Sequence, residues 1–298
     1  VTDTLNAITD VDVNDVITFT TTDSSVDASD LVDLAAKVDT FTTTSVNTIT
    51  EAYNTVALTT EITDALEIVP NAAVTVTGGS ITTTNANTID TATTGIVTAT
   101  ANTGDAVILA GLTTTGTDEI AITLANVSTT AANLNTINGK TNVAVNANAI
   151  SELTGNATDI ISAYTANTAG TITGLGTKAV IVDNTASAGN VNTIANATSG
   201  VVTATITSGA VSSTLAAITN VNTSDVITFT TTDTSVDASD LVALKLKVDN
   251  LNVDTVNQIT EVYNTANIGT VVANALNITG NTEKVIITGG TVSVTDIN

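Results

Sequence analysis

The feature that most constrains this chain is a long internal repeat. Residues 5–55 align with residues 215–265 without a gap, at an offset of 210, and about two-thirds of the aligned positions are identical. The run VITFTTTDSSVDASDLV at 16–32 recurs with one change at 226–242. Repetition at a fixed period is typical of architectures in which each unit buries its apolar face against its neighbours. The sequence therefore favours a repeat protein over a single globular core.

A weaker copy lies halfway between these two. GIVTAT at 95–100 matches GVVTAT at 200–205, at an offset of 105. The three tyrosines, Tyr53, Tyr164 and Tyr263, follow the same rhythm. We therefore predict one continuous solenoid over residues 1–298, with three units at approximately 1–105, 106–210 and 211–298.

Each unit divides again into strand-like and helix-like stretches. Alternation of Val or Ile with Thr predicts strands, because successive side chains of a strand point to opposite faces. Most of these runs are spaced 22 to 26 residues apart, and they begin at residues 16, 73, 95, 119, 142, 178, 200, 226 and 284. Between them, apolar residues at helical spacing predict short helices within 27–39, 45–54, 128–138 and 187–198.

One parallel strand and one short helix per 22 to 26 residues predicts an α/β solenoid, similar in layout to leucine-rich repeats. Val and Ile would point inward and Thr outward. The alternative is an all-β solenoid, because helices rich in Thr and Asn are weak by propensity.

Composition narrows the possible partners. The chain has 29 acidic residues against 6 basic ones, all of them Lys, and a formal net charge of −23. Nucleic acid is an unexpected partner, since phosphate binding needs clustered Lys and Arg. No stretch of 18 apolar residues is present, so we expect no membrane span.

The absence of Cys and Met, the acidity and the abundance of Thr and Asn fit an exported protein of the extracellular space or cell surface. The start at Val1, without a signal peptide, suggests a processed part of something longer.

Catalysis is not expected. With no His, Cys or Arg, the chain lacks the residues of most nucleophilic and zinc-dependent sites. A glycosidase needs only two carboxylates. However, the acids of this chain recur at repeated positions, as structural residues do. We expect no enzyme activity.

The repeated acidic loops are the candidate ligand sites. Calcium prefers several oxygen ligands, which Asp, Thr and backbone carbonyls supply. The alternative is that Asp27 and Asp30 cap a helix and that the others are solvated turn residues. The eight candidate calcium ligands are Asp15, Asp23, Asp27, Asp30, Asp225, Asp233, Asp237 and Asp240.

Two further features suggest binding surfaces. The outward Thr rows can order water and bind ice, polysaccharide or a neighbouring filament, although Thr is also simply a good outward strand residue. Solenoids need polar caps at their ends, and neither end of this sequence offers one. Uncapped ends would continue into further repeats or dock on another copy, which makes head-to-tail assembly a hypothesis.

The sequence of the repeats resembles the Thr/Asn/Ala-rich repeats of giant cell-surface proteins of marine cyanobacteria and related bacteria. The resemblance is carried by three segments: LNTINGKTNVAVNA at 134–147, GVVTAT at 200–205 and TAGTITGLGTKAV at 168–180. It implies an exported, non-enzymatic surface role. Our first hypothesis is a structural protein that assembles with itself, or with further repeats, into a filament, sheath or surface layer. The second is a calcium-stiffened adhesin region that recognises a cell surface, a glycan or ice.

Overall fold

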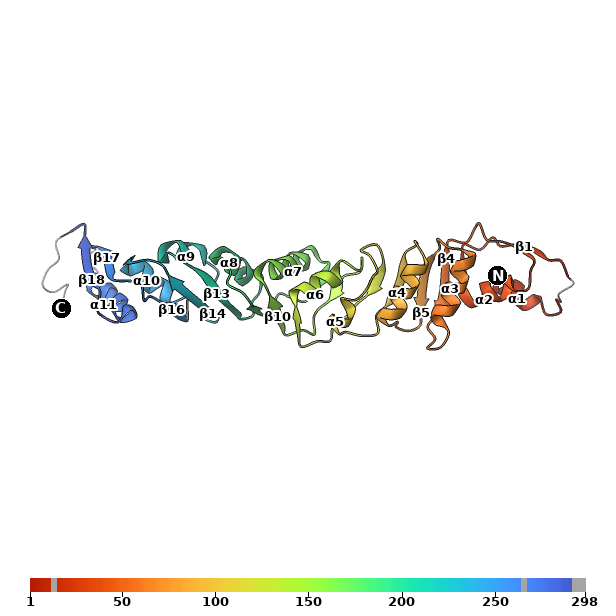
Figure 1. The fold of residues 1–298 in the computed structure, drawn as a ribbon, viewed down its shortest axis with the longest axis horizontal. Coiled ribbons are helices and arrows are strands. Elements are labelled where there is room, and N and C mark those ends of the chain that lie inside the picture. The colour runs from red at the N-terminus through yellow and green to blue at the C-terminus, as the bar shows by residue number, and fades with distance from the viewer. Residues whose placement is uncertain (12–14, 264–266, 291–298) are drawn as a thin grey trace. The chain divides into compact units, whose positions relative to one another are not determined.

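The computed structural model describes residues 1–11, 15–263 and 267–290. Within them the chain is an α/β protein, in which strands, singly or in short pairs, alternate with helices (Figure 1). All strand pairing between these elements is parallel. The prediction of an α/β fold with parallel strands is confirmed, and the all-β alternative is wrong.

The described helices are α1 Thr2–Ala7, α2 Ala28–Ala35, α3 Leu58–Ile68, α4 Thr83–Ala92, α5 Ala106–Leu109, α6 Ala131–Asn138, α7 Ala157–Ala169, α8 Ala188–Ala197, α9 Val211–Ala217, α10 Ala238–Lys245 and α11 Ile268–Thr279. The strands are β1 Thr18–Thr20, β2 Ser25–Asp27, β3 Thr40–Thr42, β4 Thr48–Ala52, β5 Ala73–Thr77, β6 Val97–Thr100, β7 Glu119–Ala121, β8 Ser128–Thr130, β9 Val145–Asn146, β10 Glu152–Gly155, β11 Ile172–Thr173, β12 Ala179–Val182, β13 Val202–Gly209, β14 Val226–Thr231, β15 Ser235–Asp237, β16 Asn250–Asn252, β17 Gln258–Val262 and β18 Lys284–Thr288.

Within every sheet, the order of the strands follows their order in the chain. The sheets are β1-β3, β2-β4-β5-β6-β7, β9-β11, β8-β10-β12-β13-β14-β16 and β15-β17-β18. Paired residues are separated by 21 positions at Thr98 and Glu119 and by 27 at Leu153 and Val180. Parallel neighbours need a crossover connection, and in this chain a short helix supplies most of them.

The apolar core lies along inward-facing rows of these strands. Val26, Ile49, Val74 and Val97 occupy paired positions on four successive strands, and all four are buried. The alternate positions on the outer face carry Thr50, Thr75 and Thr98 in the same way. The predicted alternation is therefore present, and each strand buries β-branched residues against its neighbours.

The helix predictions hold at three of the four stretches. Helices α2, α6 and α8 lie within the predicted stretches and bury their apolar residues, such as Leu31, Leu134 and Ile194. The stretch 45–54 is a correction, because its central residues form strand β4. Its residues alternate, with Ile49 and Glu51 facing inward and the intervening Thr facing outward. A buried glutamate obscures this alternation in the sequence.

The offset of 105 corresponds to a local structural motif, Thr-x-Gly. The hydroxyl of Thr93 donates to the carbonyl of Ala72, and that of Thr198 donates to the carbonyl of Lys178, both at 2.7 Å. A Cβ added at Gly95 or Gly200 would lie 2.4 or 2.2 Å from the same carbonyl oxygens. Glycine is required at both positions, because any side chain would collide with the backbone at Ala72 or Lys178.

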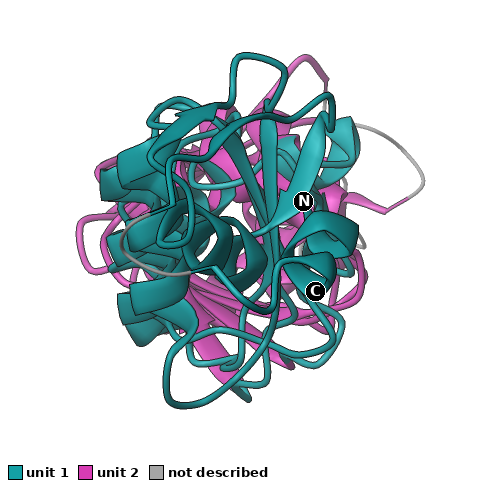
Figure 2. Cartoon of the chain, turned by 90° about the vertical axis from the view of Figure 1, so that its right-hand side faces the viewer, with its two compact units in different colours: residues 1–127, 133–150, 166–174 teal, residues 128–132, 151–165, 175–298 magenta. Residues whose placement is uncertain are grey.

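The chain forms two compact units (Figure 2). One comprises residues 1–127, 133–150 and 166–174, and the other residues 128–132, 151–165 and 175–298. The three sequence units describe repetition and the two compact units describe contacts, so the continuous solenoid of three units stays a prediction. The described helices all lack the length and hydropathy that a membrane-spanning helix needs.

Candidate functional site

The candidate calcium ligands fall into two equivalent sets, and Asp27 and Asp237 occupy the same place in each. They precede α2 and α10, and their carboxylates accept the backbone N–H groups of Asp30 and Asp240 at 3.3 and 3.1 Å. Both have extended backbone angles and act as N-caps. Such a cap contributes about 1 kcal/mol to helix stability. Asp27 and Asp237 therefore have a structural role that needs no cation.

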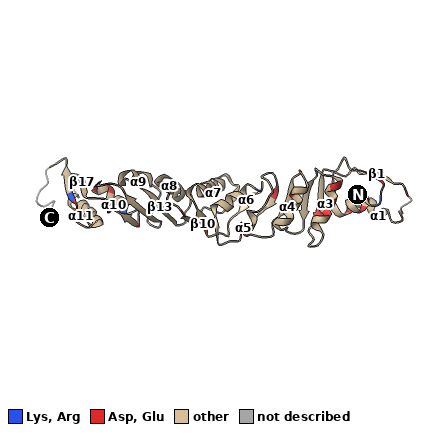
Figure 3. Cartoon of the chain, viewed as in Figure 1, with Lys and Arg blue, Asp and Glu red and all other residues tan. Residues whose placement is uncertain are grey.

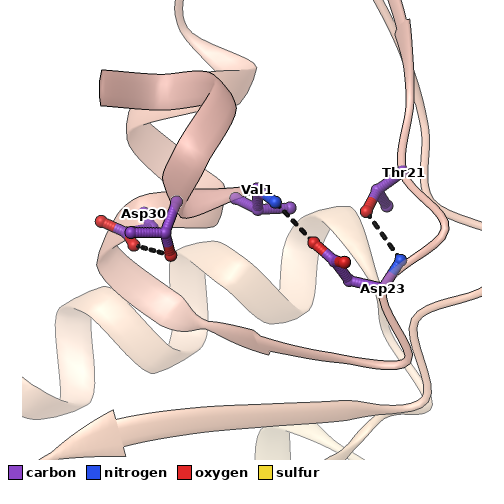
Figure 4. A network of polar contacts seen from close by, with 5 residues as sticks. Val1, Thr21, Asp23 and Asp30 are labelled. Atoms are coloured by element: carbon purple, nitrogen blue, oxygen red, sulfur yellow. Dashed lines mark hydrogen bonds and ion pairs between the residues drawn. The ribbon is translucent and has the colours of Figure 1, made fainter. Parts of the chain in front are cut away.

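Asp23 and Asp233 join neighbouring strand–helix segments. Asp233 accepts the backbone N–H of Val211 at 2.8 Å, and Asp23 accepts from the ammonium group of Val1, the equivalent residue (Figure 4). The hydrogen bond and the charge of this ammonium group lower the pKa of Asp23. Thr21, on the other side, accepts the N–H of Asp23 at 3.0 Å. Each carboxylate thus connects the start of a helix, α1 or α9, to the residues just after the next strand, β1 or β14.

Asp225 is a buried acceptor between adjacent strands. It is 2% exposed, and its carboxylate accepts N–H groups from Val202 at 2.9 Å and Asn222 at 3.0 Å. Asp118 does the same for Val97, also at 2.9 Å. Two backbone donors satisfy a carboxylate that would otherwise be costly to bury.

The counterpart of Asp225 in the first copy is Asp15, which is exposed. Asp118 was not among the candidate ligands predicted from the sequence. The signal was available, because Asp118 stands just before the strand of the weaker copy, as Asp225 stands before β14.

The last pair is Asp30 and Asp240, in the first turns of α2 and α10. The hydroxyl of Thr2 donates to Asp30. Burial, together with the charges of Asp237 and Glu261, raises the pKa of Asp240. The raised pKa of Asp240 reflects its burial first and repulsion from the two neighbouring carboxylates second.

A calcium ion takes six to eight oxygen ligands at short distances. Among the residues that the structure describes, no group of three or more Asp or Glu side chains is placed to hold a metal ion. Six of the eight aspartates accept hydrogen bonds from backbone N–H, ammonium or hydroxyl groups: Asp23, Asp27, Asp30, Asp225, Asp233 and Asp237. Calcium binding at the eight aspartates stays a prediction.

Two glutamates that the sequence analysis did not single out are buried beside these aspartates. Glu51 and Glu261 accept the backbone N–H groups of Ser29 and Ser239 at 3.3 and 3.0 Å. Burial, with the charges of Asp27 and Glu61, raises the pKa of Glu51. Their recurrence was visible in the sequence, because the motif ITE-x-Y stands at both 49–53 and 259–263.

The outward threonines form hydrogen bonds to the preceding strand. The hydroxyls of Thr50, Thr173 and Thr260 donate to the carbonyls of Val26, Val145 and Val236 at 3.2, 3.4 and 3.1 Å. These contacts favour the simpler interpretation of the Thr rows, as outward strand residues that tie neighbouring strands together.

The N-terminal end of the described chain carries a partly exposed apolar face. Five apolar residues there are half-exposed, and their equivalents in the second copy are buried. We define the N-terminal face by Val1, Ile8, Val11, Ile17 and Phe19, which correspond to Val211, Ile218, Val221, Ile227 and Phe229. Strand β14 lies between β13 and β16, whereas β1, in the described ranges, pairs with β3 alone. The face therefore corresponds to one that β13 and its neighbours cover in the second copy.

The opposite end shows the same difference. We define the C-terminal face by Val272, Leu276, Val285 and Ile287, all of them partly exposed. Their equivalents near the start of the chain, Ile62, Leu66, Val74 and Val76, are buried. The contrast is largest at Val285, which is 37% exposed while Val74 is 0% exposed. Strand β5 lies between β4 and β6, and β18 pairs with β17 as the last strand of its described sheet.

Comparison with known proteins finds no relative. No protein-family model matches the chain, and neither the curated proteins nor the solved structures contain a match. The resemblance to bacterial surface repeats therefore stays an expectation from sequence, and the two end faces are the strongest candidate site.

Proposed function

We propose that this chain is an extracellular structural protein whose copies associate end to end into a filament, sheath or surface layer. In this proposal the parallel strand–helix segments form an α/β solenoid, and the N-terminal face of one copy covers the C-terminal face of another. The proposal includes no catalytic role.

One observation carries the proposal: identical sequence is buried in one copy and partly exposed in the other. VITFTTTD at 16–23 is repeated without change at 226–233. Phe229 is 0% exposed, whereas Phe19 is half-exposed and its ring centroid lies 5.6 Å from that of Phe41. A residue selected for the interior and left partly exposed marks a surface that another chain can cover. Among the described residues β1 pairs along one edge only, and its other edge adds backbone donors and acceptors to the same surface.

Both terminal segments are acidic. Residues 1–79 hold thirteen acidic residues and one Lys, and residues 211–290 hold eight and three (Figure 3). Because like charges repel over about 8 to 10 Å at ordinary ionic strength, this excess opposes any contact between copies that brings the carboxylates together. The residues that define the two end faces are all apolar, so burial of apolar area is what favours association through these faces.

Sedimentation velocity over a range of concentrations, with electron microscopy of the same samples, tests the proposal. We expect the wild-type chain to form oligomers that lengthen with concentration and persist in a chelator. I17E on the N-terminal face and V285E on the C-terminal face should each weaken association at least about tenfold, the effect of 1.4 kcal/mol.

V107E is the matched control, because Val107 is 73% exposed and belongs to neither face. Circular dichroism shows that each variant is folded. A wild-type chain that stays monomeric at all concentrations contradicts the proposal. Monomers that bind a cell surface or glycan only with calcium would support the calcium-stiffened adhesin instead.

A further inference from the structure

A cavity of about 320 Å³ lies beside the C-terminal end of α10. It is lined by residues of two segments, 222–225 just before β14 and 245–249 at and after the last turn of α10. The carboxylate of Asp249 accepts the backbone N–H of Ile227 at 2.9 Å, which holds the second segment against β14. Both segments belong to the same compact unit. The volume falls within the range of about 300 to 1,000 Å³ that is typical of small-molecule sites.

Two lysines on the wall of this cavity are held in place by backbone carbonyls. The Nζ of Lys245 donates to the carbonyls of Val248 and Asp249 at 3.3 and 2.7 Å. The Nζ of Lys247 donates in the same way to two carbonyls just after α9, at 3.4 and 3.0 Å. An ammonium group has three N–H donors. Each lysine therefore keeps one donor for a further acceptor.

The charges around the cavity favour an anionic group as that acceptor. Of the described residues, no carboxylate forms an ion pair with either lysine. The two carboxylates that line the cavity accept backbone N–H groups instead, two at Asp225 and one at Asp249. A fixed ammonium group forms its strongest hydrogen bonds with an anionic oxygen. Because Asp225 and Asp249 repel additional negative charge, a singly charged carboxylate fits better than a dianion such as phosphate.

Two residues of the cavity distinguish it from the equivalent place in the first copy. At the offset of 210, Lys245 and Leu246 correspond to Ala35 and Ala36, while the next three residues, Lys-Val-Asp, are the same in both copies. Leu246 is 69% exposed and forms an apolar part of the cavity wall. The two differences thus add a positive charge and an apolar surface to one cavity.

We infer that this cavity binds a sugar acid, that is, a carboxylate carried on a hydroxyl-rich ring. The carboxylate accepts hydrogen bonds from Lys245 and Lys247, and the apolar side of the ring lies on Leu246. The ring hydroxyls contact Asn222 and Thr223, two polar residues that also line the cavity. The carbonyl oxygen of the Asn222 side chain accepts from Ser224, so its amide nitrogen remains as a donor.

This binding does not depend on the proposed end-to-end association, because the lining residues belong to neither end face. Saturation-transfer NMR with glucuronate as the probe measures it in monomers and oligomers alike. The samples contain a chelator, so that a calcium bridge does not contribute. We expect glucose, which has a similar ring without the carboxylate, to bind at least about tenfold more weakly than glucuronate. Raising the ionic strength should weaken glucuronate binding, because the attraction is electrostatic.

Variants locate the binding in this cavity. K245A restores the residue of the first copy and should weaken glucuronate binding at least about tenfold, whereas K245R keeps the charge and should retain most of it. L246A should weaken glucuronate binding by about threefold and leave the weaker binding of acetate unchanged. K284A is the matched control, because Lys284 is an exposed lysine of the same compact unit that does not line the cavity. Circular dichroism shows that each variant is folded.

Several results would overturn the inference: no binding of glucuronate, equal binding of glucose, or equal losses in K245A and K284A. Displacement of glucuronate by phosphate at a lower concentration would assign the cavity to an inorganic anion and overturn it as well.

Alginate, a polymer of uronic acids, distinguishes two sources of the ligand. Competition at a lower sugar concentration than glucuronate itself would support an acidic polysaccharide, and failure to compete would support a free sugar acid.

Discussion

Residues 5–55 and 215–265 share two-thirds of their sequence, yet they have different surroundings. In the second copy Phe229 and Asp225 are buried under β13, and in the first copy Phe19 is half-exposed and Asp15 exposed. Strand β14 spans Val226–Thr231, whereas β1 spans only Thr18–Thr20. The next helix, α2 or α10, has equivalent bounds in both copies and the same cap at Asp27 or Asp237. Burial and strand length differ because they depend on the neighbouring segment.

This difference separates the interactions within one strand–helix segment from those between neighbouring segments. Capping and turn contacts lie within one segment, so both copies have them. Burial of the aromatic residue and satisfaction of the buried aspartate need a strand on each side. Comparison of the two copies therefore shows what the covering strand β13 contributes to β14.

The largest expected difference between the copies is at the two phenylalanines. F229A removes a fully buried ring and should lower the free energy of unfolding by about 3–5 kcal/mol. F19A removes a half-exposed ring and should cost less than half as much. Urea unfolding of monomeric samples, followed by circular dichroism, measures both. Equal losses would break the comparison, since they would mean that the two rings are equally buried.

The equivalent aspartates should differ by a smaller amount. D225N leaves a buried amide in place of a carboxylate that accepts the N–H groups of Val202 and Asn222, and it should cost about 1–3 kcal/mol. D15N should change the stability of the monomer by less than about 0.5 kcal/mol, as is usual for exposed positions. Thermal unfolding of the two variants side by side provides the measurement. A large effect at Asp15 in the monomer would mean that its surroundings already match those of Asp225.

The smallest expected change in unfolding free energy is at Glu51, which lies near two other acidic residues. Burial, Asp27 and Glu61 raise the pKa of this carboxyl, so its protonated form favours the folded state. The wild-type protein should therefore gain stability at this site as the pH falls through the raised pKa, and that gain is absent at neutral pH. E51Q keeps an acceptor for the N–H of Ser29 and removes the charge. It should raise the unfolding free energy by less than about 1 kcal/mol at pH 7.

The advantage of E51Q should shrink as the pH approaches the ordinary range of glutamate, about 4 to 5. E61Q removes one of the two repelling charges and should give a smaller shift in the same direction. A stability of E51Q below that of the wild type at pH 7 would show that the Glu51 charge is favourable in the fold.

Much of the fold could be predicted from the sequence because apolar residues recur at strand or helix spacing in each repeat. Strands such as β5 and β6 alternate β-branched residues with Thr, and α2 and α8 carry apolar residues at helical spacing. Strand β4 could not be recognised, since the buried Glu51 breaks its alternation and Val46, Ile49 and Tyr53 imitate a helical face. The local period was ambiguous until the partner strands were known.

The candidate site was less accessible. Asp27 and Asp30 at capping spacing predicted a helix start, and the cap is present. The different burial of Asp15 and Asp225 could not be predicted, because the residues that follow them, 16–23 and 226–233, are identical. The neighbour that separates them, β13, lies outside the aligned segment. Sequence similarity alone cannot reveal such a contact.

Hydrogen exchange at the two copies of VITFTTTD tests the central claim most directly, because identical sequence gives the two segments the same intrinsic exchange pattern. Peptides that extend to Ser24 or Thr234 distinguish the copies. We predict that residues 226–231 are protected at every protein concentration, while residues 16–20 exchange quickly in dilute solution and become protected as copies associate. Residues 16–20 that exchange at one unchanged rate from dilute to concentrated solution would contradict end-to-end association through β1.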